Sequence, residues 1–244
     1  MKANIEKLPK STIKLEVTVP HEKVKETYDQ VLAAATESAE VEGFRKGKAP
    51  KDIVEKSLDP AKLNGEVVNK LLEKYYVQAI KENKINPISN PKVEITQFEP
   101  EKDFKFTAKV ATRPDVKLGD YMKILEKKLE ERHEEVQKKK EEALKKGEDL
   151  KHVHDHLHTQ EIIQGIVEAT EVEVPELLVE DEANRMKARF VDQMKNLDMN
   201  FEDYLEAQGK SKEEFAKGLK AQAENNLKAE FALAQAVKDS EIEV

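Results

Sequence analysis

Residues 11–40, STIKLEVTVPHEKVKETYDQVLAAATESAE, change their hydrophobic period at one proline, Pro20. Before this proline, apolar and polar residues alternate, which predicts a strand with one buried face. Its apolar positions are Ile13, Leu15, Val17 and Val19. After the proline the spacing becomes that of an amphipathic helix. The apolar face of this helix comprises Val24, Tyr28, Val31, Leu32, Ala35 and Ala39. A strand that leads directly into a helix indicates a domain in which helices pack on a sheet.

The following residues complete this domain. KDIVEKSL (51–58) predicts a short helical segment, and Asp59 with Pro60 is a favourable N-cap and first-turn pair for the next helix. The apolar face of that helix comprises Leu63, Val67, Leu71, Leu72, Tyr75, Ala79 and Ile80. After the breaker NPISNP, alternation predicts two more strands, KVEITQF (92–98) and DFKFTAKVATR (103–113). The order strand, helices, strand, strand predicts an α+β domain over residues 1–114.

The composition favours long helices with wide solvated faces over a thick core. Charged residues make up 38% of the 244 residues and aromatic residues only 5%. The absence of cysteine excludes disulfides, thiolate metal sites and cysteine nucleophiles. No apolar run approaches the roughly 18 residues of a membrane span, and the amino terminus lacks the apolar region of a signal peptide. We therefore expect a cytoplasmic protein with no membrane partner.

The net charge of −8 is divided unevenly along the chain. Residues 1–118 contain 22 Lys and Arg against 19 Asp and Glu, a net charge of +3. Residues 119–244 contain 20 against 31, a net charge of −11. A basic amino half and an acidic carboxyl half suggest different partners for the two.

The carboxyl half is predicted to be entirely helical. Glu and Lys dominate residues 118–147, and apolar positions become sparse after Leu129, so much of this helix should be exposed. Further helices are predicted over residues 148–170, 175–197, 200–209 and 211–238. The buried set of the first of these should be Leu157, Ile162, Ile163, Ile166 and Val167. Capping signals are an N-cap at Asn200 and a capping box of Ser211 with Glu214. After the α+β domain we expect a linker and long charged helix over residues 115–147 and an elongated all-α domain over residues 148–244.

The segment VEGFRKGKAPKD (41–52) joins two predicted helices and is unusually basic. Its cations are Arg45, Lys46, Lys48 and Lys51. Gly43 and Gly47 allow backbone conformations closed to other residues, and Pro50 ends the turn. A projecting tip with four cations suits contact with phosphate groups, and Phe44 adds an apolar or stacking anchor. The alternative is a solvated turn, which the spacing alone favours.

Within this segment, GFRKGKAP (43–50) resembles the ribosome-docking signature of bacterial trigger factor, G-F-R-x-G-K-x-P, at every fixed position. QEIIQGIVEATEVEVPELLVEDEANRM (160–186) is similar to the helix, linker and V-P helix start of that family's C-terminal domain. The segment from FEDYLEAQG to the end of the chain (201–244) resembles the part that follows. The resemblance covers nearly all of residues 1–118 and 160–244.

The resemblance implies a chaperone that meets nascent chains at the ribosomal tunnel exit. Phe44, Arg45 and Lys46 would dock on a protein of the large subunit and on adjacent ribosomal RNA. The residues implied in ribosome binding are Gly43, Phe44, Arg45, Lys46, Gly47, Lys48 and Pro50. The helical half would form a cradle for unfolded polypeptides, and the free protein could form a homodimer. No cofactor is implied.

The sequence departs from the family pattern in two places. Family members usually carry a prolyl isomerase domain between their halves, but the interval 119–158 is short for a domain and contains one aromatic residue, Tyr121. We therefore expect no isomerase activity. The chain also stops at EIEV (241–244), where family members usually continue into further helices. We expect either a reduced cradle or a truncated chain.

Two other patterns in the sequence are candidate sites. HVHDHLH places His152, His154, His156 and His158 in alternation, and on a helix these would form two i, i+4 pairs. Each pair lacks a third ligand, so a polar helix that partly charges below about pH 6.5 is the favoured interpretation, and no metal site is predicted. An apolar stripe comprises Met186, Phe190, Met194, Leu197, Met199, Phe201 and Tyr204. It suits varied apolar clients. For any one of its residues, packing on the helix around Phe215 and Leu219 is the favoured alternative.

Two alternative functions remain open. The first is a prolyl isomerase, as in full-length family members, which a proline-limited refolding assay would reveal. The second is a ribosome-independent chaperone or assembly factor that uses the helical half alone. Nucleophile elbow, Walker and dinucleotide-binding motifs are absent from the sequence, so other enzyme classes are not predicted.

Overall fold

The structure, a computed structural model, describes residues 1–39, 44–45, 47, 50–99, 101–146 and 155–240. The chain divides into two compact units, Met1–Arg113 and Pro114–Val244, which we call the first and second units. The expected class, an α+β domain followed by a helical domain, is confirmed.

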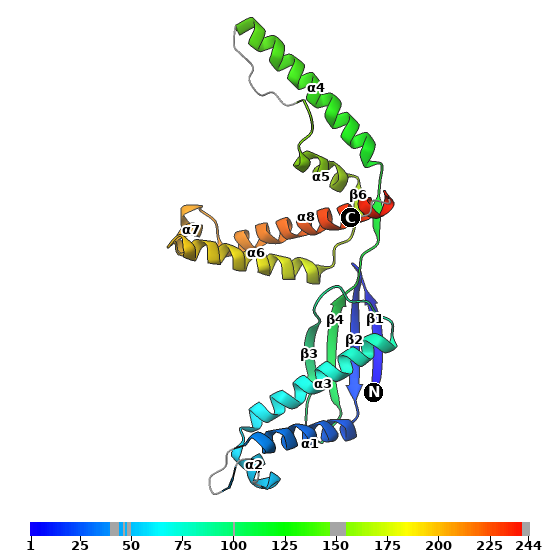
Figure 1. The fold of residues 1–244 in the computed structure, drawn as a ribbon, viewed down its shortest axis with the longest axis vertical. Helices are drawn as coiled ribbons and strands as arrows, with labels where there is room; N and C mark the ends of the chain where they lie inside the picture. The colour runs from blue at the N-terminus through cyan, green and yellow to red at the C-terminus, as the bar shows by residue number, and fades with distance from the viewer. Residues whose placement is uncertain (40–43, 46, 48–49, 100, 147–154, 241–244) are drawn as a thin grey trace. The chain divides into compact units, whose positions relative to one another are not determined.

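The first unit is a four-stranded antiparallel sheet with helices on one face (Figure 1). Its elements are β1 (Lys2–Leu8), β2 (Thr12–Val19), α1 (His21–Ser38), α2 (Lys51–Ser57), α3 (Pro60–Glu82), β3 (Lys92–Gln97) and β4 (Phe104–Ala111). The strand order is β1-β2-β4-β3. Helix α3 contacts both β2 and α1, so the core lies between the sheet and these helices.

In β2 and β4, buried and solvent-facing side chains alternate as predicted. Leu15, Val17 and Val19 of β2 are buried, as are Phe104 and Phe106 of β4. Buried residues of α1 and α3 complete the same cluster, among them Val24, Val31, Leu63, Val67, Leu71 and Tyr75. The predicted cap of α3 is also present, because Asp59 Oδ1 accepts a hydrogen bond from the N–H of Ala61 at 2.9 Å and Pro60 is the first helical residue.

Strand β1 was not anticipated from the sequence. It pairs with β2 in antiparallel register from Lys2 opposite Thr18 to Leu8 opposite Thr12. The connecting turn uses positive φ at Lys10 (54°) and Ser11 (48°), where hairpin turns usually carry Gly or Asn. Because the turn lacks those residues, the sequence gives no hairpin signal.

The second unit is helical apart from one short strand pair. Its elements are β5 (Val116–Leu118), α4 (Tyr121–Lys146), α5 (Thr159–Glu168), β6 (Thr170–Val172), α6 (Glu176–Asn196), α7 (Phe201–Ala207) and α8 (Lys212–Asp239). Strands β5 and β6 pair antiparallel. The predicted capping box begins α8: Ser211 Oγ accepts from the N–H of Glu214 at 3.1 Å, and the N–H of Ser211 donates to Glu214 Oε2 at 2.9 Å.

The helix expected over residues 148–170 is wrong at residues 155–158 and at its carboxyl end, and residues 148–154 lie outside the described residues. Helix α5 begins only at Thr159, and residues 170–172 form β6. Of the five residues expected to be buried, Ile166 is buried but Ile162 is exposed. The apolar spacing of a short helix extends into a following strand without a break, so periodicity alone cannot place the boundary.

Most side chains of helix α4 are exposed, as its charged sequence predicts. Val136 and Ala143 are buried despite the charged residues around them. Its basic side chains also reach back to the segment around α5. Lys128 Nζ lies 2.9 Å from Glu168 Oε2, Arg132 pairs with Glu161, and His133 Nε2 lies 3.2 Å from Asp155 Oδ1. The charged face of α4 therefore attaches this helix to its neighbour.

Within the part of the chain that the structure describes, no helix is long and apolar enough to cross a membrane.

The core of the first unit gives a stability prediction. Leu71→Ala, at a fully buried position of α3, should lower the free energy of unfolding by about 2–5 kcal/mol, because it leaves a cavity against the sheet. Val77→Ala on the same helix is the matched control, since Val77 is 44% exposed and should change stability by less than about 0.5 kcal/mol. Urea unfolding followed by circular dichroism measures both. Equal effects would contradict the assigned core.

Candidate functional site

The loop between α1 and α2 presents an aromatic ring and a guanidinium to solvent. Phe44 is 43% exposed and lies outside the core cluster, and Arg45 is also exposed. The structure records no ion pair from Arg45 to another described residue. Gly43, Lys46 and Lys48 of the predicted docking set lie outside the described residues. Gly47, another member, lies at the base of the loop, and Pro50 directly precedes α2. In the described part of the loop, the ring of Phe44 and the guanidinium of the adjacent Arg45 are therefore both accessible to a partner.

Gly47 closes the base of this loop. Its N–H donates to the carbonyl oxygen of Ala39 at 3.3 Å, so the chain returns to the end of α1. Its φ is +72°, in the left-handed region that favours glycine. A Cβ at this position would lie 2.8 Å from the carbonyl oxygen of Glu37, which is closer than real Cβ contacts. Both the backbone angle and the space therefore require glycine here.

Helix α2 fixes the other side of the loop. It begins directly after Pro50, whose carbonyl accepts from the N–H of Val54 at 3.1 Å. The side chain of Val54 is fully buried. The hydroxyl of Tyr28 on α1 donates to Glu55 Oε1 of α2 at 2.7 Å. Partial burial, together with the adjacent Glu55 carboxylate, raises the pKa of Tyr28 to about 12, so the phenol keeps its proton at neutral pH.

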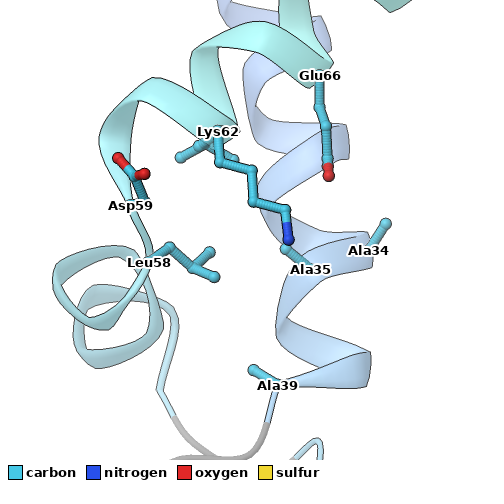
Figure 2. Close-up of a pocket in the computed structure, with 8 residues that line it drawn as sticks. Ala34, Ala35, Ala39, Leu58, Asp59, Lys62 and Glu66 are labelled. Carbon is cyan, nitrogen blue, oxygen red and sulfur yellow. The ribbon is translucent and has the colours of Figure 1, made fainter.

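A shallow hollow lies beside the base of the loop, between α1 and the start of α3 (Figure 2). Its volume is about 440 Å³, and its lining residues are Ala34, Ala35, Ala39, Leu58, Asp59, Lys62, Leu63 and Glu66. In Figure 2 the side chain of Lys62 extends across the space toward Ala35. Small side chains on α1 leave the space, and its rim carries both signs of charge. Sequence reasoning missed this hollow, because it depends on two helices that meet only in the fold.

The predicted client stripe separates into packed and exposed residues. Phe190 of α6 packs its ring against Tyr204, Phe201 and Phe215, with centroid distances of 5.0, 6.1 and 5.1 Å. These rings join α6, α7 and α8, and Met194 is buried at 8% exposure. Met186 packs against the small apolar cluster between α6 and α8. These five stripe residues therefore pack between helices, which is the alternative that the sequence favoured.

The two remaining stripe residues are solvent-exposed. Leu197 and Met199 are 64% and 44% exposed on the turn between α6 and α7. Asp198 between them has a positive φ of 53°, which lets the turn present both neighbours outward. We call Leu197, Asp198 and Met199 the apolar tip. It is the part of the predicted client surface that is available to a partner.

The histidine pairs expected on a helix are not found where they can be checked. His156 and His158 precede α5, and His158 is its N-cap residue, so neither belongs to a helical i, i+4 pair. Their rings lie 5.6 Å apart, edge to face. His152 and His154 lie outside the described residues. Among the residues described, no group of three potential metal ligands is brought together.

Two family models match the chain and together span it. The model for bacterial trigger factor protein (TF) matches residues 1–147, and the model for the bacterial trigger factor protein (TF) C-terminus matches residues 118–244. The chain belongs to the trigger factor family. The two matches overlap on residues 118–147, which contain α4, so every residue lies within at least one of them.

Curated trigger factors align with part of the chain. The trigger factor of Staphylococcus epidermidis is 46% identical over 107 residues, which make up 44% of this chain and 25% of that protein. The Clostridium botulinum trigger factor is 38% identical over 129 residues, 53% of this chain and 30% of that protein. The Ruminiclostridium cellulolyticum protein is 37% identical over 130 residues, with the same two shares. The chain thus matches less than a third of the length of these relatives.

A solved structure of a trigger factor shares the fold. It comes from work on promiscuous substrate recognition in the folding and assembly activities of the trigger factor chaperone. The likeness covers 100% of this chain and 86% of that one, with a TM-score of 0.61 and 15% identity. It supports the trigger factor fold for both units.

Gly47 gives a prediction for this trigger factor loop. Gly47→Ala should open the base of the loop and lower the free energy of unfolding by at least about 1 kcal/mol, because alanine is strained at positive φ and its Cβ meets Glu37. Gly65→Ala in α3 is the control: no atom lies within 4 Å of its added Cβ, and the change should stabilise by about 0.5–1 kcal/mol. Urea unfolding compares the two variants. A stabilised Gly47→Ala would show that the loop is not closed at this residue.

Proposed function

We propose that this trigger factor family member is an ATP-independent chaperone that docks on the large ribosomal subunit and shields nascent polypeptides. The observation that carries the proposal is the exposed pair Phe44 and Arg45 on a loop closed by Gly47. The family assignment supports it, because GFRKGKAP (43–50) in this loop resembles the family's ribosome-docking signature. We also propose that the protein is cytoplasmic and that it forms a homodimer when it is not bound to the ribosome.

The loop suits docking because its frame is fixed while its binding groups are free. The Tyr28–Glu55 hydrogen bond and the buried Val54 hold α2 against α1. A loop held at both ends loses little conformational entropy when it binds, so more of the contact energy appears as affinity. Arg45 can donate two parallel hydrogen bonds to a phosphate or carboxylate. Phe44 can enter an apolar pocket or stack on a base.

The second unit suits client binding because it exposes apolar side chains beside many charges. The apolar tip provides Leu197 and Met199, and methionine adapts to partners of varied shape. The net charge of −11 on residues 119–244 opposes nonspecific aggregation through the exposed surface. Weak contacts of this kind need no chemical step, so ATP is not required. We further propose that the chain has no isomerase activity, since α4 takes up most of the described residues of the interval 119–158.

Docking is tested by pelleting ribosomes with a loop variant. Phe44→Ala, Arg45→Ala and Lys46→Ala together should abolish co-sedimentation while far-UV circular dichroism stays unchanged, because the two described side chains make no core contact. Binding by the unchanged protein should weaken as salt rises, by roughly 0.7–0.9 in the log–log slope for each phosphate contacted. The control combines Lys70→Ala, Val77→Ala and Lys81→Ala, which remove two cations and an exposed apolar group from α3. Undiminished pelleting of the loop variant would refute the docking site and leave the ribosome-independent chaperone.

Client binding is tested at the apolar tip. Leu197→Ser with Met199→Ser should weaken suppression of aggregation of a chemically unfolded client, measured by light scattering. Partial burial of each side chain contributes about 1 kcal/mol, which corresponds to about fivefold in client affinity per residue. Met122→Ser with Val237→Ser is the control, since both are exposed on other helices of the second unit. If the two double variants suppress aggregation equally, the tip has no special role.

A further inference from the structure

Strand β1 is one edge of the sheet in the first unit (Figure 1). It pairs with β2 in an unbroken register. Among the residues that the structure describes, no backbone hydrogen bond joins β1 to a segment other than β2. An edge strand keeps a row of N–H and C=O groups that point away from its neighbour, and such a row can pair with a further strand. The outer side of β1 can therefore accept another strand.

The other edge strand, β3, is protected against such pairing. Pro91 directly precedes it, and a bulge interrupts its register between Ile95 and Gln97. Proline and bulges are common devices that keep edge strands from pairing with other chains. Strand β1 contains neither proline nor glycine, and its register has no bulge. Of the two edges, β1 is thus the one whose backbone suits a partner strand.

The two faces of β1 differ in chemistry. Lys2, Asn4 and Glu6 are exposed on the face opposite the core. Ala3 and Ile5 lie on the other face, partly buried against the main apolar cluster. A two-fold axis perpendicular to the sheet would make the β1 strands of two copies antiparallel and keep the helices of both on the same side. Polar residues would then lie opposite polar residues, and apolar opposite apolar.

In the register centred on Asn4, the two strands are complementary at every pair from Lys2 to Glu6. Lys2 of each copy lies opposite Glu6 of the other, so the symmetry creates two pairs of opposite charge. Ala3 of each copy lies opposite Ile5 of the other, and the two Asn4 amides meet at the axis. Opposite charges or apolar groups at directly opposite positions stabilise a pair of strands. The sequence of β1 therefore matches its own reverse.

The adjacent registers lose this match. Centring the pair on Ile5 puts Lys2 opposite Leu8 and Ala3 opposite Lys7, so each charge faces an apolar side chain. Centring it on Ala3 places Glu6 beyond the end of the second copy's β1. Only the register centred on Asn4 pairs the charges.

Both charged groups are accessible to a second copy. Lys2 has no ion pair with a residue that the structure describes, and it is exposed. Glu6 Oε2 lies 3.6 Å from Lys14 Nζ, but Lys14 lies closer to Glu16 Oε1, at 2.6 Å. The side chain of Glu6 is 59% exposed. Its carboxylate can therefore take a second cation without leaving Lys14 unpaired.

We infer that the outer edge of β1 binds the β1 edge of a second copy of this chain and joins the two four-stranded sheets into one continuous antiparallel sheet. This inference rests on the homodimer proposed above and names its interface. An unrelated extended polypeptide fits less well, because it lacks the reversed charge pattern that Lys2 and Glu6 require. Pairing from Lys2 to Glu6 buries less than the roughly 1,200 Å² of a standard interface, so the dimer dissociates readily.

Disulfide trapping tests the register. The chain has no cysteine, so Asn4→Cys introduces a single thiol. At the axis its Cα would lie about 4.5–5.5 Å from that of the second copy, within the range that a disulfide spans. Mild oxidation should link most of the Asn4→Cys protein as a dimer. Glu94→Cys, at an exposed position of β3, is the control and should remain unlinked.

Charge reversal tests the two ion pairs. Lys2→Glu creates two like-charge pairs in the dimer and should weaken dimerisation about tenfold at low salt. Glu6→Lys should weaken it similarly, whereas Lys2→Glu with Glu6→Lys restores opposite charges and should recover it. Lys70→Glu on α3 is the control and should leave dimerisation unchanged. Analytical ultracentrifugation over a dilution series measures each variant, and circular dichroism verifies its fold.

The failures of this inference and of the proposed function are distinguishable. A chain that stays monomeric at every concentration would refute both the homodimer and its interface, but not ribosome docking. Three results would refute the β1 interface alone: a dimer that Lys2→Glu leaves unchanged, equal linking of Glu94→Cys, and linking of Asn4→Cys to a cysteine-bearing unfolded client in preference to its copy. The loop variant Phe44→Ala, Arg45→Ala, Lys46→Ala should lose ribosomes but still dimerise.

Discussion

The strict alternation of β4 is the constraint on which the first unit depends. This strand lies between β2 and β3, and its residues Phe104 and Phe106 are buried with ring centroids 5.5 Å apart. A shift of one residue in register would turn both rings to solvent and bring Lys105 into the core. The same alternation assigns the lysines to the open face. The alternation along β4 therefore determines both the core on which α3 packs and the charge of the opposite face of the sheet.

The loop between α1 and α2, which we propose as the docking site, depends on that core through α1 and α3. Helix α3 packs on the sheet and α1 packs on α3, so the end of α1 is placed by buried contacts well away from the loop itself. Three local features then determine the loop: Gly47 returns the chain to Ala39, Val54 is buried, and Tyr28 holds Glu55. None of these uses Phe44 or Arg45. The structure thus separates the residues that shape the loop from the residues that remain free to bind, which lets the binding residues change without loss of the fold.

Sequence reasoning succeeded where local signals agree with tertiary packing. The strand at residues 12–19 and the caps at Asp59 and Ser211 follow from alternation and from side chains that bond to their own backbone. Prediction from sequence failed where a feature depends on contacts between segments that are distant in the chain. The β1–β2 turn adopts positive φ without glycine, because the long register of paired strands compensates for the strain. By contrast, the exposure of the Phe44 ring could be anticipated, because it lies in a short basic segment between two helices. The hollow beside it, and the division of the stripe into packed rings and an apolar tip, required knowing which helices meet.

The difference in packing between the two units accounts for their proposed roles. In the first unit one large apolar cluster joins sheet and helices, and such a cluster resists local opening. The described residues of the second unit form only small buried clusters, between α6 and α8 and around the contact of α5 with α8. Its helices are held in addition by ion pairs at their surfaces, such as Lys128 with Glu168 and Lys220 with Glu176, and such pairs contribute less than about 1 kcal/mol each. A unit with a small core keeps apolar side chains at its surface and opens locally at low cost. Those are the properties that a surface for varied unfolded clients requires, whereas a fixed docking loop requires the rigid frame of the first unit.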